Sequence, residues 1–167
     1  IPGCELISVE KMQSTQAMRA IAEHSDKTYT LLYTKHTALK IGMFALERMV
    51  QVMEMTQAGM VYADHYQQID GVQKTAPVID YQPGSLRDDF NFGSVLLFNA
   101  NAFKEVIENT EEEYQYAGLY DLRLKISQKS KLVHINEYLY TEVESDKRKS
   151  GEKQFDYVDP KNRQVQI

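Results

Sequence analysis

The chain has 167 residues, 43% of them hydrophobic, and a formal net charge of -5 at pH 7. This length suits one hydrophobic core, and the acidic balance argues against a nucleic-acid partner, because phosphate backbones are bound by clustered Lys and Arg. Cys4 is the only cysteine, so no internal disulfide can form, and no apolar stretch approaches the roughly 20 residues of a membrane span. We therefore expect a cytoplasmic domain, and the start at Ile1 in place of Met predicts a segment of a longer polypeptide.

The first quarter of the chain contains two strand-like runs with a helical pattern between them. Residues 5–9 and 29–33 are short apolar runs typical of strands. Ser14 or Thr15 can cap a helix between them, whose apolar side is Ala17, Met18, Ile21 and Ala22.

A change of hydrophobic period marks the next helix. Leu46, Met49, Val50 and Met53 follow the i, i+3, i+4, i+7 spacing, which predicts a helix over residues 44–55 with Leu46 and Met53 buried. Residues 60–63 form another apolar run, which ends at Asp64. Two strands joined by such a crossover pair in parallel and take ligands at their carboxyl ends. The candidate site is therefore residues 34–37, with residues 64–66 as its neighbour.

The second half begins with a polar stretch. Residues 67–87 contain Gly and Pro and predict a long connection over the edge of the sheet. Asp88 and Asp89 precede a strand-like run at 92–98; they could replace metal carboxylates, although such a pair is more often a turn partnered by Arg87. Asn99 or Asn101 can begin a helix that continues through residue 107.

The last part of the chain is less regular. The periodicity of residues 116–127 fits a strand or a helix. Residues 132–135 and 138–143 are strand-like, and His134 within the first run is more often a structural histidine than a ligand. We divide the chain into a domain at 1–144 and a connector or docking tail at 145–167.

The ordered series of segments resembles the family 2 glycosyltransferases, which have the GT-A fold. The residues that carry the resemblance are LLYTKHTALKIGMFALERM, GMVYADHYQQIDG, DDFNFGSVLLFNANAFKEV and YAGLYDLRLKISQKSKLVHINEYLYTEVE, within residues 28–144. The resemblance implies an α/β fold, GT-A-like and Rossmann-related, with a mostly parallel sheet, covering helices and a helix over 116–127. Nothing matches the family's first nucleotide-binding strand, so this strand is expected to be missing.

The family's metal motif is altered in this sequence. The family transfers a sugar from a nucleotide-sugar to a hydroxyl acceptor, and an Asp-x-Asp after the strand that matches residues 29–33 holds Mg or Mn against the donor diphosphate. Thr34, Lys35 and His36 occupy these positions. They could contact a phosphate, together with Asp64, but none of the three is a good metal ligand, and an ordinary polar strand end is the alternative. We assign no metal ligand and expect no cofactor for this segment.

The family's general base is altered as well. The resemblance places an acidic pair before the helix at 116–127, where one carboxylate accepts the proton of the acceptor hydroxyl. Gly118 and Leu119 occupy these positions and cannot accept a proton. Asp121 and Asp89 are the candidate catalytic carboxylates that remain, although a residue at position 121 more often supports the helix.

Two functional hypotheses follow. In the first, the chain is part of a protein that transfers a sugar from a nucleotide-sugar to a glycan or other hydroxyl acceptor. In the second, it is a non-catalytic glycosyltransferase-like domain, a scaffold or binding module for a further, catalytic domain of the same polypeptide.

Overall fold

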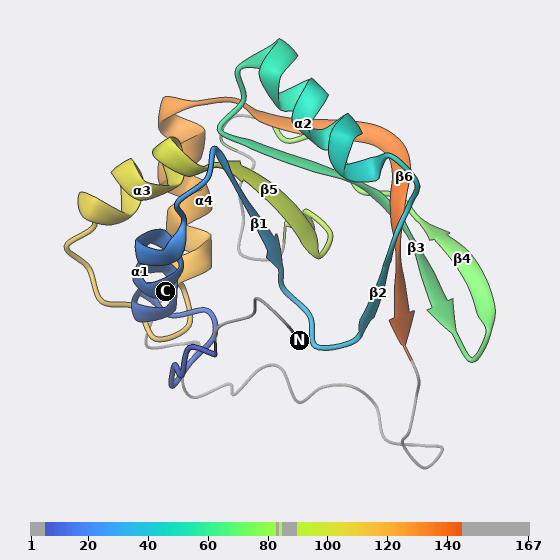
Figure 1. The fold of residues 1–167 in the computed structure, drawn as a ribbon, viewed down its shortest axis with the longest axis horizontal. Coiled ribbons are helices and arrows are strands. Elements are labelled where there is room, and N and C mark those ends of the chain that lie inside the picture. Colours follow the sequence, from blue (N-terminus) through green and yellow to red (C-terminus); the bar gives the residue numbers. More distant parts are fainter. Residues whose placement is uncertain (1–5, 83, 85–89, 145–167) are drawn as a thin grey trace.

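The computed structural model describes residues 6–82, 84 and 90–144, which form one sheet with helices on both faces (Figure 1). The α/β class expected from the sequence is confirmed. The elements in chain order are α1 (Thr15–His24), β1 (Tyr29–Tyr33), β2 (Ala38–Ile41), α2 (Ala45–Thr56), β3 (Met60–Ile69), β4 (Val72–Ala76), β5 (Val95–Asn99), α3 (Ala100–Glu108), α4 (Gly118–Lys129) and β6 (Leu132–Glu144). None of the described helices is long and apolar enough to cross a membrane.

The sheet is mixed, so the expectation of a mostly parallel sheet is wrong. Its order is β1-β5-β3-β6-β2, with β4 paired to β3. Only β3 and β6 pair in parallel; the β1/β5, β3/β5, β2/β6 and β3/β4 pairs are antiparallel. β1 and β3 do run in the same direction, but β5 lies between them and runs the other way. The local hydrophobic pattern identified these strands but contains no information about a third strand inserted between two others.

Two further segments were also assigned wrongly. The expected connection at 67–87 contains the end of β3 and all of β4, joined by a hairpin turn in which Asp70 and Gly71 have φ of 51° and 82°. An Asp-Gly pair favours this two-residue turn because both positions require positive φ. Residues 6–9 are not a strand, and residue 5 lies outside the described part.

The two strand-like runs near the end of the described chain are one strand, β6. Ala63 pairs with Ile135 and Asp64 pairs with Tyr138, so Asn136 and Glu137 have no partner on β3. The register shifts a second time between Asp64 and His65, which pairs with Tyr140, and the strand continues through both irregularities.

Helices α1 and α3 begin at caps that the sequence predicts. Ser14 caps α1 by accepting the backbone N–H of Ala17 at 3.0 Å, and Asn99 caps α3 through the N–H groups of Asn101 and Ala102. Residues 118–129 form a helix, α4, as the resemblance implied.

Each face of the sheet has its own hydrophobic core. Helices α1, α3 and α4 cover one face, where the buried residues include Met18, Phe103 and Leu122. Helix α2 covers the other face, and Met53 on it is only 2% exposed. The predicted burial of Leu46 is wrong, because it is 40% exposed. The buried side of α2 follows Ala45, Met49 and Met53, and Leu46 lies beside this stripe.

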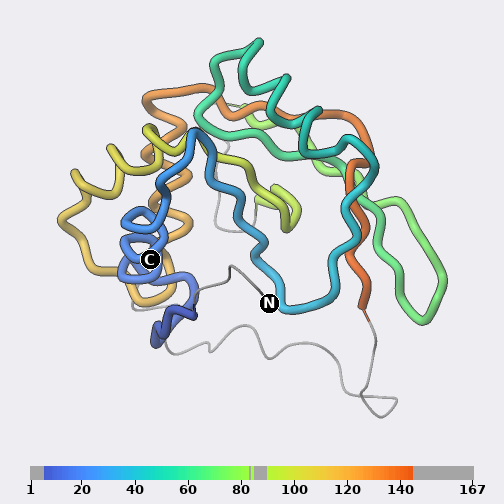
Figure 2. The backbone as a smooth tube through the Cα atoms, viewed as in Figure 1, coloured from blue at the N-terminus to red at the C-terminus, as the bar shows by residue number. Residues whose placement is uncertain are grey.

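The sheet is curled, which brings its two edge strands together at one end. β1 and β2 occupy opposite ends of the strand order, yet only residues 34–37 connect them. Five Cα steps span at most about 18 Å. Figure 2 follows the chain from β1 through this connection to β2, which lies alongside β6. The connection therefore passes near the ends of several strands.

Candidate functional site

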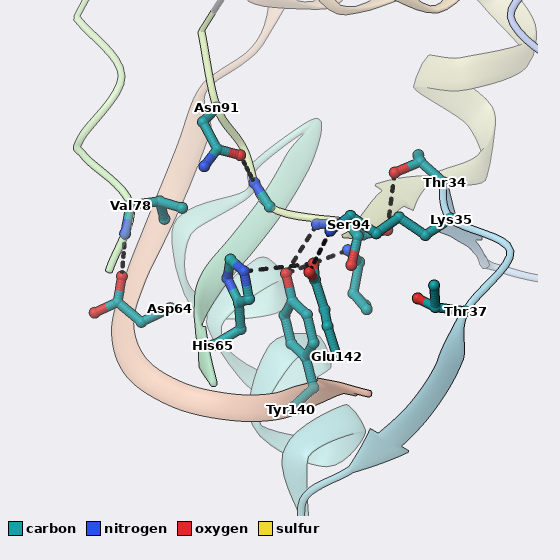
Figure 3. Close-up of polar contacts among 12 residues, drawn as sticks. Thr34, Lys35, Thr37, Asp64, His65, Val78, Asn91, Ser94, Tyr140 and Glu142 are labelled. Carbon is teal, nitrogen blue, oxygen red and sulfur yellow. Dashed lines mark hydrogen bonds and ion pairs between the residues drawn. The ribbon is translucent and has the colours of Figure 1, made fainter. Parts of the chain in front are cut away.

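Residues 34–37, the first part of the expected site, form the connection from β1 to β2 at one end of the sheet (Figure 3). The connection is attached to the beginning of β5, because the backbone N–H of Thr34 donates to the carbonyl of Ser94 at 2.9 Å. The Tyr33 hydroxyl donates to the carbonyl of Thr37 at 3.0 Å and closes the turn. Thr34 and His36 are exposed, and Lys35 extends toward β6.

Lys35 is held by two carboxylates of β6. Its Nζ forms an ion pair with Glu142 and a second, longer one with Glu144 Oε1 at 3.3 Å. Burial acts to lower the pKa of Lys35, but the hydrogen bond and charge of Glu142, with those of Glu144, outweigh burial and raise it. The single cation of the connection is therefore already neutralised by side chains of the same chain.

Glu142 is the buried centre of this cluster, with a side chain only 1% exposed. Burial acts to raise its pKa, but the hydrogen bond from Lys35 and the neighbouring charges lower it overall. Its other oxygen faces Nε2 of His65 at 3.4 Å. Burial lowers the pKa of His65, so its imidazole is neutral at pH 7. The other ring nitrogen, Nδ1, is buried and has no hydrogen-bond partner in the described part of the chain.

Tyr140 connects this cluster to β5. Its ring stacks on His65, with centroids 5.0 Å apart, and its hydroxyl accepts the backbone N–H of Ser94 at 2.9 Å. Burial raises the pKa of Tyr140. Gly93, with φ of 72°, leaves room for this hydroxyl, because a Cβ at this position would collide with it.

Asp64 belongs to a separate polar group on the opposite face of the sheet. Its Oδ1 accepts the backbone N–H of Val78 at 2.8 Å and lies 2.9 Å from His134 Nε2. The second ring nitrogen of His134 faces Asp80 at 2.7 Å, and its ring stacks on Tyr62. Both ring nitrogens of His134 therefore have partners within the chain, as expected of a structural histidine. Asp64 therefore holds the backbone of Val78 against β3, and it does not point toward Lys35 (Figure 3).

The candidate catalytic carboxylates are not part of the Lys35 cluster. Asp121 lies in the first turn of α4 and pairs with Lys125 at 2.8 Å, and no described hydrogen bond or ion pair joins it to Lys35. Asp89, like its neighbour Asp88 and the tail at 145–167, lies outside the described residues.

The two positions that match the family's acidic pair are packed against other parts of the protein. The N–H of Gly118 donates to the carbonyl of Gln13 at 2.7 Å, and a Cβ at position 118 would collide with the backbone of Ser14 and Thr15. Leu119 is buried in the core beneath α4. A carboxylate at position 118 would therefore require α1 to move away from α4.

Sequence reasoning identified Lys35 but missed its partners. Glu142 and Glu144 lie more than 100 residues further along the chain. A usable signal was present, because residues 140, 142 and 144 alternate along one strand and therefore face the same side of the sheet.

The described residues offer no ready metal site. Within 6–82, 84 and 90–144, no group of three or more His, Cys, Asp or Glu side chains is arranged to hold a metal ion. Glu142 and Glu144 are suitable oxygen ligands, but the ammonium of Lys35 occupies the place between them. What the cluster can do chemically is hold the β1 to β2 connection against β6.

Comparison with known proteins adds no family to these observations. The chain matches no protein-family model, and none of the curated proteins has a matching sequence.

Proposed function

We propose that the chain is a GT-A-like, family 2 glycosyltransferase-like domain of a protein that transfers a sugar from a nucleotide-sugar to a hydroxyl acceptor, and that this domain does not perform the transfer itself. It serves as a scaffold or binding module for a separate catalytic domain. The proposal rests on the resemblance of residues 28–144, on the α/β class, and above all on the state of Lys35.

The observation that carries the proposal is the neutralisation of Lys35 by Glu142 and Glu144. A donor diphosphate at the end of β1 would meet one positive and two negative charges, with His65 neutral. Without a bridging cation, this local field repels the diphosphate.

The packing of α4 supports the absence of turnover. Gly118 has no side chain and has no space for one, and Leu119 is part of the core. General-base catalysis needs a proton acceptor within hydrogen-bond reach of the acceptor hydroxyl. Asp121 is the nearest carboxylate along the sequence, and its side chain is already engaged in an ion pair with Lys125.

The position of β1 supports an incomplete nucleotide site. β1 is an edge strand, and its outer side has no strand partner among the described residues. Its sequence YTLLY contains no charge, whereas edge strands are usually protected by charged residues or proline. The family's first nucleotide-binding strand, which nothing in this sequence matches, could pair with the free edge of β1 only if it came from outside the described residues.

The proposal is tested by donor turnover. The chain is incubated with uridine and guanosine diphosphate sugars in the presence of Mn²⁺, and release of the nucleoside diphosphate is measured. We expect no release above that of buffer. Metal-dependent release that saturates with donor would overturn the proposal and make the chain a working transferase.

A variant with restored carboxylates tests the loss of the metal ligands separately from the loss of the general base. The double variant Thr34→Asp, His36→Asp places carboxylates where the family has them. We expect it to gain metal-dependent nucleotide affinity but no turnover, because Gly118 and Leu119 still supply no base. Turnover by this variant would show that Asp121 or another carboxylate acts as the base.

A further inference from the structure

The strongest unassigned feature of the described chain is Arg123, on α4, which has no acidic partner there. The other described arginines are paired: Arg19 with Glu113, and Arg48 with Glu137 at 2.7 Å. Arg123 forms no ion pair within residues 6–82, 84 and 90–144, and its Nε is buried without a hydrogen-bond partner. Asp121, two residues earlier, turns to Lys125 instead.

Arg123 is partly buried against an aromatic side chain. Its Cζ lies 4.9 Å from the centroid of the Phe92 ring. Burial lowers the pKa of Arg123 to about 10, so the guanidinium is still charged at neutral pH. A cation on an aromatic face is stabilised only in part, and a charge withdrawn from water without a counter-charge is unfavourable. Among residues 6–82, 84 and 90–144, the guanidinium therefore has no oxyanion of the kind that its geometry suits.

The surroundings of Arg123 offer an apolar surface next to the charge. Phe90 lies 4.4 Å from Phe92 and 6.1 Å from Tyr81, measured between ring centroids. Phe90 and Tyr81 pack on the core and are only partly buried. A ligand at this place would meet a cation and an aromatic surface together, which is the composition of a small-molecule site.

We propose that Arg123 binds the oxyanion of a small ligand, a carboxylate or a phosphate, whose ring packs on the surface formed by Phe90 and Tyr81. This site is separate from the Lys35 cluster, and the proposal does not depend on the glycosyltransferase-like function. The shared chemistry is a planar or tetrahedral oxyanion that accepts two parallel N–H donors.

The test follows the Arg123 Nε–H resonance by NMR. The signal is assigned by its loss in Arg123→Lys and is then followed during titration with phosphate, glucuronate or glucose, with ionic strength held constant by chloride. We expect a saturating shift with a midpoint of about millimolar for at least one of the two anions and none for glucose. A response to phosphate alone or to glucuronate alone identifies the oxyanion, and no saturating shift with either anion overturns the proposal.

Thermal unfolding provides the control. The anion that saturates the NMR shift should raise the unfolding midpoint of the wild type and of Arg48→Gln, whose arginine is paired at the surface, but not that of Arg123→Gln. An equal rise in Arg123→Gln would show a general salt effect and refute the assignment. If Arg123→Gln does not fold, Arg123→Met replaces it, since an apolar chain of similar length retains the contact with Phe92.

Discussion

Replacing Lys35 with Met tests the energetics of the Lys35 cluster. The substitution keeps the aliphatic stem but leaves Glu142, 1% exposed, without its cation. Removing one partner of a buried ion pair costs about 3 to 5 kcal/mol. The Lys35 side chain is 35% exposed, so solvent screens part of the interaction. We therefore expect the substitution to lower the free energy of unfolding by about 1 to 3 kcal/mol at pH 8.

The sign of the pH dependence follows from the pKa of Glu142. In the wild type this pKa lies below its ordinary value of 4.5, so the group contributes stability above that value and loses it as the pH falls. In Lys35→Met the burial of Glu142 is opposed only by Ser94 and His65, and we expect its pKa to rise. The charged form is then less favoured in the folded state than in the wild type, so the variant loses stability relative to the wild type as the pH rises through the new pKa. His65 acts in the same direction, because Lys35 lowers its pKa in the wild type.

Urea unfolding of both proteins at pH 5 and pH 8, followed by circular dichroism, measures the difference. The loss of unfolding free energy in Lys35→Met, relative to the wild type, should be larger at pH 8 than at pH 5. Lys40→Met is the matched control, because Lys40 is exposed and contacts the amide of Gln68, so its effect should be small and independent of pH. The reasoning is refuted if the Lys35→Met penalty is equal at the two pH values or below about 0.5 kcal/mol at pH 8.

Four further substitutions test the packing that surrounds the site. Gly118→Glu should lower the free energy of unfolding by at least about 1 to 3 kcal/mol, because the new side chain collides with the start of α1; an unchanged urea midpoint would contradict this. Met53→Ala should cost about 2 to 5 kcal/mol and Leu46→Ala below about 1 kcal/mol, as only Met53 is buried; similar losses would refute the assigned face of α2. Tyr140→Phe leaves the N–H of Ser94 without its acceptor and should speed hydrogen exchange there, and wild-type protection would show that the hydroxyl is dispensable.

Local sequence patterns predicted the elements better than their arrangement. The caps at Ser14 and Asn99 identified α1 and α3, because a capping side chain acts within its own turn. The direction of neighbouring strands depends on contacts between distant segments, so the antiparallel β5 between β1 and β3 was not foreseen. The β3/β4 hairpin was missed because its strands are polar, although Asp70 and Gly71 marked its turn.

The same distinction applies to the candidate site. Lys35 was identified from its place after a strand, but whether it is free to bind a phosphate depends on Glu142 and Glu144, far along the chain. Asp64 also follows an apolar run, and only the structure places it with Val78 and His134 on the other face. A strand-end position therefore identified Lys35 correctly, but it showed neither the carboxylates that pair with Lys35 nor the face on which Asp64 lies.

The titration of nucleotide into the chain tests the central claim most directly. Isothermal titration with uridine or guanosine diphosphate, with Mg²⁺ or Mn²⁺ present, should show no binding tighter than about millimolar. The reason is that the cation of Lys35 is already shared by two carboxylates, and an exposed ion pair contributes only about 0 to 1 kcal/mol, against the roughly 8 kcal/mol of a micromolar complex. A metal-dependent micromolar dissociation constant would contradict the account, because carboxylates of this chain would then hold a cation and a donor diphosphate together.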